Sequence, residues 1–166
     1  MRLPPDPRPR QRRFFRAIRD GKSTIAGDGN APRSMAYVDN LCQGLLLAAR
    51  EPRAGGQTYW IADERPYSMN EVMDTVERLL EGEFQQACAH RRRRLPELAC
   101  DIAQLLDSGL QTMGAHHPGV HEMSEANRTI ACTTARAEAE LGYRPVVALE
   151  EGMRRSLRWC FENGGL

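Results

Sequence analysis

The chain has 166 residues, enough for one domain with a buried hydrophobic core. Its 23 basic and 22 acidic residues leave a formal net charge of +1, which argues against a dedicated nucleic-acid-binding protein. The longest strongly apolar run, residues 45–49, is too short to cross a bilayer, so we expect no membrane segment. The first ten residues lack the apolar stretch that is typical of a signal peptide.

The cysteines favour a reducing compartment. There are five of them, widely spaced and without a Cys-x-x-Cys pair. Small secreted domains held together by disulfides show an even, denser pattern. We therefore expect a cytoplasmic protein whose cysteines are small buried apolar side chains rather than catalytic thiols.

The N-terminal part is predicted to begin as extended chain, because residues 1–10 hold four prolines and three arginines. A short helix follows and ends at Gly21. Its apolar face consists of Phe14, Phe15 and Ile18. Residues 23–26 then predict a short strand, and residues 27–30 read Gly-Asp-Gly-Asn, which is typical of a turn.

Residues 37–61 predict a helix followed by a strand. Asp39 is a good N-cap for this helix. The helix carries apolar residues at helical spacing, namely Leu41, Leu45 and Ala48. Pro52 and the glycine pair at 55–56 end it. Residues 57–61 form a continuous, partly β-branched and aromatic run, which predicts a strand buried on both faces.

The clearest boundary in the chain is the start of a helix after Ser68. Ser68 and Glu71 have the spacing of a capping box, and Tyr67 with Val72 occupies the positions of a hydrophobic staple. The helix is predicted to end at Gly82. Its apolar face consists of Val72, Val76, Leu79 and Leu80.

The second half of the chain is predicted to be mainly helical. A strand near residues 83–87 precedes an arginine run at 91–94, and helical patterning follows over 98–106. A short helix over 134–141 ends at Gly142. The last helix carries Met153, Leu157 and Phe161 at four-residue spacing. Early alternation of strands and helices indicates an α/β protein with too few strands for a complete doubly wound sheet.

Three segments carry motifs in a fixed order. Residues 27–41 read G-D-G-N-A-P-R-S-M-A-Y-V-D-N-L. Residues 56–68 contain G-Q-T-Y-W-I and then E-R-P-Y-S. Residues 135–153 contain A-R-A-E-A-E-L-G-Y-R-P and then L-E-E-G-M. Together they resemble the C-terminal, substrate-binding part of the extended short-chain dehydrogenases/reductases, the NAD-dependent epimerase/dehydratase family.

This resemblance implies the fold and the cofactor of the parent family. We expect a partial Rossmann-like unit of a few mostly parallel strands with a helix-rich C-terminal substrate-binding region. Residues 1–66 would form the end of the sheet with a substrate-side turn, and residues 67–166 the mainly helical region of the same single domain. Residues 2–11 resemble the family's R-P-x-x-V-Y-G-P-R-Q segment, with Pro7 in place of tyrosine and Arg8 in place of glycine.

Two signatures of such enzymes are missing from the sequence. There is no G-x-x-G-x-x-G loop, which lets a helix N-terminus approach the cofactor pyrophosphate. There is also no Tyr-x-x-x-Lys pair, because the one lysine is Lys22 and Ile18 stands four residues before it. The Gly27-x-Gly29 turn lacks a third glycine, since Pro32 occupies that position. We therefore expect no catalytic residue here and no tight binding of NAD or NADP by this chain alone.

The resemblance also implies substrate-binding residues. Arg33 matches an arginine that contacts the substrate diphosphate in sugar-nucleotide members, a role that suits a planar bidentate donor. The alternative is a solvated turn arginine or a structural ion pair. Arg10 and Gln11 are placed at the cleft entrance, and Arg128 is a second candidate anion contact. The R-x-G-D segment of many sugar-nucleotide members is missing, so nucleotide-sugar and sterol-like substrates both stay open.

Other polar signals favour structure over function. Asp39 and Asn40 match an Asp-Asp/Asn pair of the family, and we expect them to cap the helix rather than touch ligand. The run at 90–94 could dock a phosphate or nucleic acid, but without interleaved aromatic residues a solvated connection is the better interpretation. Three histidines offer a possible pair of metal ligands, namely His116, His117 and His121. Zinc needs more convergent ligands, so we expect a solvated loop and no metal.

Two functions therefore compete. The first is the substrate-binding portion of an NAD(P)-dependent epimerase, dehydratase or hydroxysteroid-type dehydrogenase, either truncated or part of a split protein, and inactive alone. Its partners would be a small-molecule substrate and its missing N-terminal half. The second is a non-catalytic interaction module that associates with a full-length relative or with itself, because an incomplete sheet exposes an edge and apolar faces. A small unrelated enzyme using the histidine cluster is a third, weaker alternative.

Overall fold

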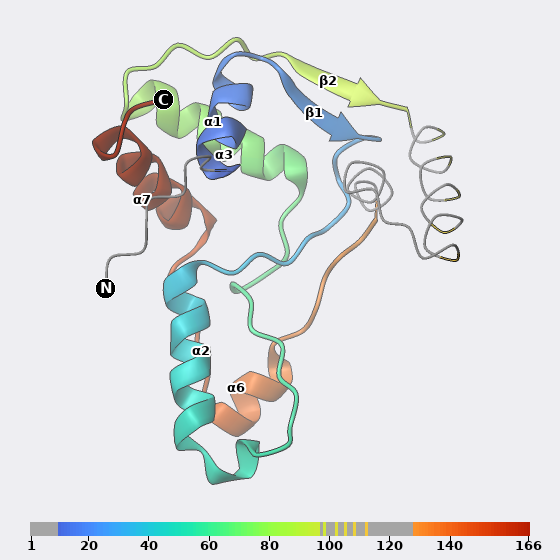
Figure 1. The fold of residues 1–166 in the computed structure, drawn as a ribbon, viewed down its shortest axis with the longest axis vertical. Helices are drawn as coiled ribbons and strands as arrows, with labels where there is room; N and C mark the ends of the chain where they lie inside the picture. The colour runs from blue at the N-terminus through green and yellow to red at the C-terminus, as the bar shows by residue number, and fades with distance from the viewer. Residues whose placement is uncertain are drawn as a thin grey trace.

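The computed structural model describes residues 10–96 and 128–166, together with positions 98, 102, 105, 108 and 112. In chain order the named elements are α1 Arg10–Arg19, β1 Ser23–Ala26, α2 Val38–Arg50, the 3-10 helix η1 Pro52–Ala54, α3 Met69–Gly82, β2 Arg92–Leu95, α6 Ala135–Leu141 and α7 Leu149–Glu162. Figure 1 shows them in two groups. Helices α1, α3 and α7 lie with both strands, and helices α2 and α6 lie together below them.

The α/β class is confirmed by a small parallel sheet. Strands β1 and β2 pair in parallel, from Ser23 opposite Arg92 to Ala26 opposite Leu95. This matches a partial Rossmann-like unit, in which parallel strands need a long crossover between them. Within the described residues, none of the helices has the length and apolar character that crossing a membrane requires.

The second strand does not lie where the sequence predicts it. Residues 83–87 are not a strand, because Gln85 has a φ of +54°, which turns the chain instead of extending it. The strand is instead formed within the arginine run that was expected to be a solvated connection. Arg92 can sit there because its guanidinium pairs with Glu77 of α3 at 2.7 Å and with Asp74.

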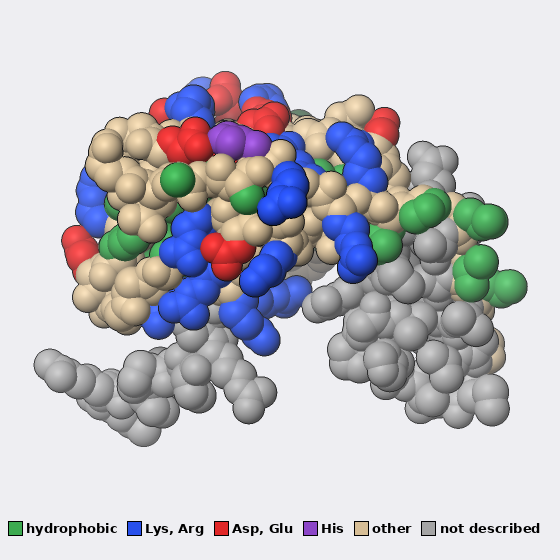
Figure 2. Space-filling model, turned by 90° about the horizontal axis from the view of Figure 1, so that it is seen from above, with side chains coloured by type: hydrophobic (Ala, Val, Ile, Leu, Met, Phe, Trp, Pro, Cys, Tyr) green, Lys and Arg blue, Asp and Glu red, His purple; other side chains and the backbone are tan. Residues whose placement is uncertain are grey.

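The arginines of β2 belong to a mixed surface. Figure 2 shows this face of the molecule, where basic side chains are interspersed with acidic ones. Exposed His90 lies at the start of the run, and its Nε2 is 2.7 Å from Glu81 Oε1. A mixed surface of this kind does not create the one-sign potential that nucleic-acid binding uses. The arrangement therefore agrees with the near-neutral net charge.

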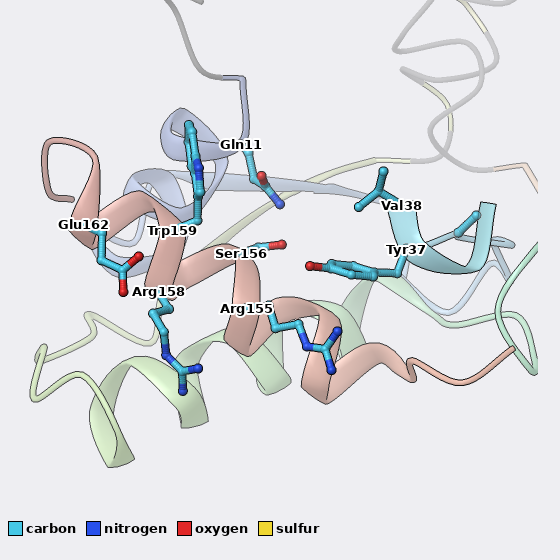
Figure 3. Close-up of a pocket in the computed structure, with 9 residues that line it drawn as sticks. Gln11, Tyr37, Val38, Arg155, Ser156, Arg158, Trp159 and Glu162 are labelled. Carbon is cyan, nitrogen blue, oxygen red and sulfur yellow. The ribbon is translucent and has the colours of Figure 1, made fainter. Parts of the chain in front are cut away.

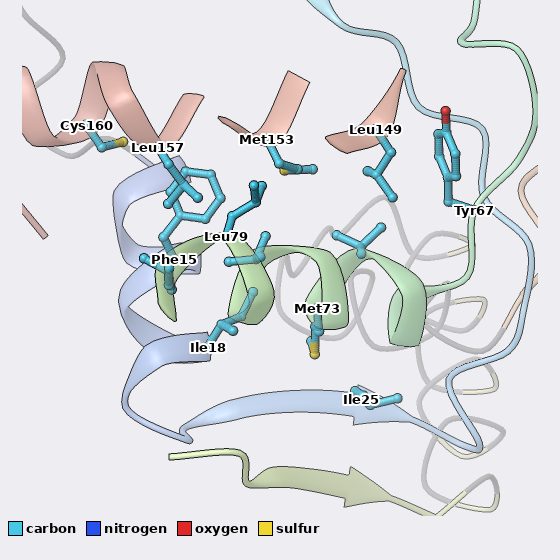
Figure 4. Packing of buried hydrophobic residues seen from close by; sticks show 13 residues of the cluster. Phe15, Ile18, Ile25, Tyr67, Met73, Leu79, Leu149, Met153, Leu157 and Cys160 are labelled. Atoms are coloured by element: carbon cyan, nitrogen blue, oxygen red, sulfur yellow. The ribbon is translucent and has the colours of Figure 1, made fainter. Parts of the chain in front are cut away.

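The main core joins α1, α3 and α7, as Figure 4 shows. Phe15 and Ile18 of α1 are fully buried, as their shared helical face predicts. The remaining buried members include Val72, Val76, Leu79 and Leu80 of α3 and Leu149, Met153 and Leu157 of α7. Burying each such side chain contributes about 1.5–3 kcal/mol. Because α1 lies before residue 66 and the other two helices after it, this core crosses the boundary between the two predicted regions.

Helix α3 begins as predicted. The Ser68 hydroxyl accepts a hydrogen bond from the Glu71 N–H at 3.1 Å, so Ser68 is its N-cap. Tyr67 and Val72 are both buried in the main core, where the predicted staple needs them. The helix ends at Gly82, and Glu71 also pairs with Arg65. The capping box is therefore confirmed.

Helix α2 does not begin as predicted. Its N-cap is Tyr37, and Asp39 lies in the first turn without capping it. The helix has no side-chain cap, and the Tyr37 N–H donates to Asp63 Oδ1 at 2.9 Å, so a carboxylate from a distant segment fixes the residue at which the helix starts. The Asp39 side chain pairs with Arg155 of α7 at 3.0 Å. The predicted capping role of Asp39 is therefore wrong.

The apolar face of α2 is also reversed. Leu41 and Leu45 are 41% and 61% exposed, whereas Asn40 and Gly44 are buried. The buried face packs on a second, smaller core whose buried members are Ala137, Leu141 and Tyr143. The Tyr143 hydroxyl donates to the Ala62 carbonyl at 2.6 Å, and burial raises the pKa of Tyr143 to about 12. The left-handed Gly142, with a φ of +68°, ends α6 as predicted.

The predicted strand at residues 57–61 is not formed. Tyr59 and Ile61 pack against the second core, but Trp60 between them is 65% exposed. Within the described residues no strand lies beside this segment, so it stays extended without a ladder. The sequence pattern is that of a buried strand, and the partner that such a strand needs is not among these residues.

Asn40 connects the two groups of elements. Its amide Nδ2 donates to Asp63 Oδ1 and to the Val147 carbonyl, both at 2.7 Å. Its Oδ1 accepts from the N–H groups of Val146 and Val147 at 3.0 and 3.1 Å. Asn40 is fully buried, and Asp63 is 5% exposed. This one side chain therefore holds α2, the segment before α3 and the segment before α7 in register.

We expect Asn40→Ala to lower the free energy of unfolding by about 3 kcal/mol, because it leaves the buried Val147 N–H and carbonyl without this partner and removes a hydrogen bond from the buried Asp63 carboxylate. Urea denaturation followed by circular dichroism measures this. The matched control is Asn163→Ala, since the exposed Asn163 amide donates only to the Trp159 carbonyl. We expect the control to cost less than about 1 kcal/mol. Equal losses from the two variants would contradict the role of Asn40.

Candidate functional site

Residues 33–38 contribute to the lining of four neighbouring hollows in the structure. They are held on both sides by backbone hydrogen bonds. Arg33 exchanges two of them with Tyr67, at 2.9 and 2.8 Å, and the Asp63 N–H donates to the Met35 carbonyl at 2.7 Å. Ser34 donates its N–H to the Ile130 carbonyl at 2.8 Å. The segment is therefore a fixed extended strip between the turn after β1 and the start of α2.

The α7 cleft, which is separate from a hollow of about 590 Å³ beside Trp60, has a volume of about 540 Å³ and lies between the first turns of α1 and α2 and the outer side of α7. Figure 3 shows the side chains around it. The polar and aromatic side chains that line it include Gln11, Tyr37, Arg155, Ser156, Arg158 and Trp159. A smaller hollow of about 110 Å³ adjoins it and shares Gln11, Tyr37 and Ser156. The two together form one continuous candidate site.

Neutral hydrogen-bonding groups converge in this cleft. In Figure 3 the Tyr37 hydroxyl, the Ser156 hydroxyl and the Gln11 amide point toward one another from three different elements. Each of the three can both donate and accept a hydrogen bond. Trp159, which is 51% exposed, adds a flat apolar surface to the wall. The site can therefore hold a molecule that combines hydroxyl groups with a ring face.

The cationic side chains of the cleft differ in how they are engaged. Arg155 lies over the Tyr37 ring, 5.8 Å from its centroid, and pairs with Glu151 at 2.7 Å and with Asp39. The hydrogen bond to Glu151 raises the pKa of Arg155. Its charge is thus compensated, and its effect is to orient the Tyr37 ring. Arg158 is exposed on the outer wall, where it can meet an anionic group.

The structure divides the four predicted substrate-binding residues between two places. Gln11 lines the α7 cleft, and Arg10 precedes Gln11 at the exposed start of α1. Arg33 lines a separate hollow of about 200 Å³ with Ile130. Arg128 is exposed two residues before Ile130. Gln11 and Arg33 therefore belong to neighbouring hollows that share Met35, and their roles in binding stay predictions.

Sequence reasoning missed the contribution of α7. Arg155, Ser156 and Trp159 were not chosen as site residues, although their spacing places them near one face of the last helix. The core residues Met153, Leu157 and Cys160 occupy the other face. The polar face of this helix, following directly on a family motif, was the signal that could have identified them. The sequence placed Tyr37 in a family motif but did not predict it as a site residue.

The turn after β1 does not fit a dinucleotide. A Cβ added to Gly29 would lie 2.6 Å from Ile25 Cγ2 and 2.8 Å from Asn70 Oδ1, so the chain's own atoms already fill the space beside it. Asn70 also donates to the Asp28 carbonyl at 2.8 Å. A pyrophosphate loop instead leaves its glycine backbone open to the ligand. The described residues therefore do not supply an NAD cradle at this turn.

Metal ligands are not gathered in the described part of the chain. Across residues 10–96 and 128–166, no group of three or more His, Cys, Asp or Glu side chains is placed to hold a metal ion. His116, His117 and His121 lie outside the described residues. The prediction that they form a solvated loop is therefore untested.

We expect Gly29→Ala to destabilise the fold by about 2 kcal/mol or more, because its φ of +76° is unfavourable for alanine and the new Cβ meets Ile25. Thermal unfolding by differential scanning fluorimetry gives the comparison. The matched control is Gly82→Ala, at the last residue of α3, where a Cβ meets nothing within 4 Å. That variant should gain about 0.5–1 kcal/mol. A Gly29→Ala protein as stable as the wild type would contradict the closed turn.

Comparisons with known proteins match this chain to part of the length of larger proteins. No protein-family model matches it. It is 46% identical over 155 residues to the uncharacterized protein y4nL of Sinorhizobium fredii, covering 93% of this chain and 44% of that protein. It is 30% identical to 3beta-hydroxysteroid-dehydrogenase/decarboxylase isoform 2 of Arabidopsis thaliana, covering 85% of this chain and 27% of that enzyme.

A solved structure shows the same fold. The UDP-glucuronic acid 4-epimerase of Bacillus cereus, in complex with UDP-glucuronic acid and NAD, superposes with a TM-score of 0.61. It is 19% identical, and the match covers 95% of this chain and 41% of that one. The chain thus spans less than half the length of the curated relatives it matches. The resemblance to the NAD-dependent epimerase/dehydratase family is confirmed, for a part of the length of its members.

Proposed function

We propose that this chain, whose relatives are NAD-dependent epimerases, dehydratases and hydroxysteroid dehydrogenases, is the substrate-binding portion of such an enzyme. A separate portion would bind NAD or NADP and carry the catalytic Tyr-x-x-x-Lys pair. The parent reaction would move a hydride between a substrate carbinol and the nicotinamide. This chain would supply the position and the specificity of the substrate.

One observation carries the proposal. The chain is homologous to redox enzymes but contains a single lysine, Lys22, with Ile18 where the catalytic tyrosine would stand. The packed turn at Gly29 gives further support, because Ile25 and Asn70 of this chain fill the space beside that glycine. Both observations support the proposal that the redox machinery belongs to a separate portion. Alone, the chain should bind substrate without turnover.

The cleft and the neighbouring hollow suit a small molecule with hydroxyl and anionic groups. Gln11, in the cleft, would bind hydroxyl groups together with Tyr37. Arg33 would bind a diphosphate or another anion through its planar guanidinium, with Arg10 and Arg128 as further contacts at the rim. The two substrate classes that the relatives suggest are a nucleotide-sugar and a 3β-hydroxysteroid-like molecule.

The cysteines support a reducing, cytoplasmic location for this protein. Cys42, Cys88, Cys132 and Cys160 are free thiols in the described part of the chain. Burial raises the pKa of Cys88 to about 11, which makes its thiol a poor nucleophile. A catalytic thiol at that position is therefore not proposed. Neither a nucleic acid nor a membrane is proposed as a partner.

The second candidate function is a non-catalytic interaction module. The observation that favours it is the set of large apolar side chains exposed on α2 and at Trp60. Such a module would associate with a full-length relative or with a second copy of itself. Substrate binding by the isolated chain distinguishes the two candidates, because only the first requires it.

Binding can be followed through Trp159 in the cleft. The variant Trp60→Phe leaves Trp159 as the one tryptophan, so its emission reports the cleft alone. We expect titration with UDP-glucuronic acid or with a 3β-hydroxysteroid to change that emission to saturation, and only one of the two classes to do so below millimolar concentration. Absence of saturable change with both ligands would contradict a substrate-binding role.

We expect Arg33→Ala to weaken binding of the active ligand about tenfold or more, because a charge-assisted hydrogen bond is lost. The same Trp159 titration, made in the Trp60→Phe background, measures the dissociation constants. Arg50→Ala is the matched control, since Arg50 is exposed at the end of α2 away from these hollows. An unchanged dissociation constant for Arg33→Ala would show that Arg33 does not bind the ligand and would favour the alternative of a structural role.

Cofactor binding tests the other half of the proposal. We expect isothermal titration calorimetry of the purified chain with NAD, NADH, NADP and NADPH to show no binding tighter than about 1 mM, for want of a glycine-rich loop. A full-length epimerase of the family is the positive control under the same conditions. Micromolar binding of any of the four would overturn the division between the two portions.

A further inference from the structure

The smaller hollow beside the α7 cleft has a buried carboxylate in its wall. Asp63 is 5% exposed and lines this hollow of about 110 Å³. Tyr37, Ser156 and Gln11 contribute hydroxyl and amide groups to the same lining. The rest of the lining consists of apolar side chains and backbone, and none of the lining residues is basic. The hollow is therefore a small acidic and polar site with an apolar floor.

The fold uses one oxygen of Asp63 and leaves the other. The Tyr37 N–H and the Asn40 amide both donate to Oδ1, at 2.9 and 2.7 Å. Within residues 10–96 and 128–166, no donor is placed on Oδ2. A carboxylate can accept about four hydrogen bonds, two at each oxygen. Because Asp63 lines the hollow, its Oδ2 is the acceptor that remains for a molecule that enters.

Among the residues that the structure describes, no cationic side chain pairs with Asp63. Arg155, in the adjoining cleft, pairs instead with Glu151 at 2.7 Å and with Asp39 at 3.0 Å. Helix α7 begins beside the hollow, but Glu150 and Glu151 in its first turn offset the positive end of its dipole. The carboxylate therefore keeps a negative charge that a ligand can meet.

The negative charge of Asp63 also acts on the phenols around it. Burial, followed by the Asp63 charge, raises the pKa of Tyr67. Burial and then the same charge raise the pKa of Tyr143 to about 12. Both phenols therefore stay protonated at neutral pH and add no second charge. The same field favours a positive group beside Asp63.

The hollow has room for one small group. A water molecule takes up about 30 Å³ of liquid, so the volume corresponds to about three waters. An ammonium on a short carbon chain is of this size. Its N–H donors match acceptor oxygens on Asp63, Tyr37 and Ser156, and its carbons would meet the apolar floor. A Cβ added to Gly152 would lie 3.0 Å from Tyr37 Cδ2, so the ring and α7 close that side of the hollow.

We propose that the smaller hollow binds a protonated amine, held by Asp63 Oδ2 together with the Tyr37 and Ser156 hydroxyls. The inference rests on the proposed function, because it names a chemical group that the same site prefers in its substrate. The body of the molecule would lie in the adjoining α7 cleft, against Trp159. A hydroxyl fits the same space but brings no positive charge to the carboxylate. An amino-substituted ligand should therefore bind more tightly than its hydroxyl analogue.

Small fragments test the hollow directly. The probes are ethylammonium chloride and ethanol, which have the same carbon chain and differ in the polar group. We expect ethylammonium to shift the amide signals of Gly152 and Ser156 in a ¹⁵N–¹H correlation spectrum, with a dissociation constant on the order of millimolar. Ethanol should bind at least about tenfold more weakly, because only the ammonium makes a charge-assisted contact. Sodium chloride at equal ionic strength controls for salt.

Matched variants separate binding from folding. Asp63→Asn keeps an Oδ1 that accepts from Tyr37 and Asn40, so the fold should be retained, while an NH₂ group replaces Oδ2 in the hollow. We expect it to weaken ethylammonium binding about tenfold or more. Glu64→Gln is the matched control, since Glu64 is exposed and does not line the hollow. Its dissociation constant should equal that of the wild type.

A second variant makes the test independent of the fate of Asp63→Asn. Ser156→Ala removes one acceptor from the half-buried side of α7, and we expect it to weaken ethylammonium binding about threefold or more. Circular dichroism of the three variants shows whether each is folded.

The inference fails if ethanol and ethylammonium bind equally, or if sodium chloride reproduces the shifts. It also fails if folded Asp63→Asn, or folded Ser156→Ala, binds ethylammonium as well as the wild type does. Failure of the proposed function has a different signature, the absence of a saturable Trp159 response to either of the larger ligands. A fragment that binds while both larger ligands do not would separate the two.

Discussion

The buried amide of Asn40 is the interaction on which the arrangement of this chain depends. An amide both donates and accepts, and here it donates to Asp63 and Val147 while accepting from the backbone before α7. An aspartate at this position could accept but not donate, and it would face the Asp63 carboxylate. Asp63 in turn accepts from the Tyr37 N–H and fixes the start of α2. A few polar atoms thereby decide how three segments distant in sequence meet.

The rotation of α2 follows from this anchor. With Asn40 and Gly44 turned inward, Leu41 and Leu45 must face outward, which reverses the usual arrangement of a surface helix. A buried polar group costs little when all its hydrogen bonds are made, so the inward asparagine is tolerated. The outward leucines have no such compensation in water. The hydrogen bonds of Asn40 stabilise the chain as it is. The exposed leucines would contribute to stability only if another layer buried them.

Local signals in the sequence predicted the elements whose causes are local. The Ser68 cap, the left-handed Gly142 and the apolar faces of α3 and α7 need only neighbours within a few residues. The wrong predictions concern positions decided from far away. Asp39 does not cap α2, whose first residue is fixed by the distant Asp63 carboxylate, and the arginine run became a strand because α3 supplies acidic partners for Arg92. No local pattern contains that information.

The residues of the candidate site also fall into two kinds, those that a local motif predicts and those that only the packing of distant segments brings in. Gln11 and Arg33 could be predicted because a linear motif carries them, whereas Ser156 enters the cleft only through the packing of α7. The residue types at 57–61 are those of a buried strand. The segment forms no strand because no neighbouring strand pairs with it among the described residues. Under the proposed function, a separate cofactor-binding portion would carry the Tyr-x-x-x-Lys pair that this sequence lacks. The described residues themselves show a cleft lined by α7 and, elsewhere, an apolar face of α2 that none of them covers.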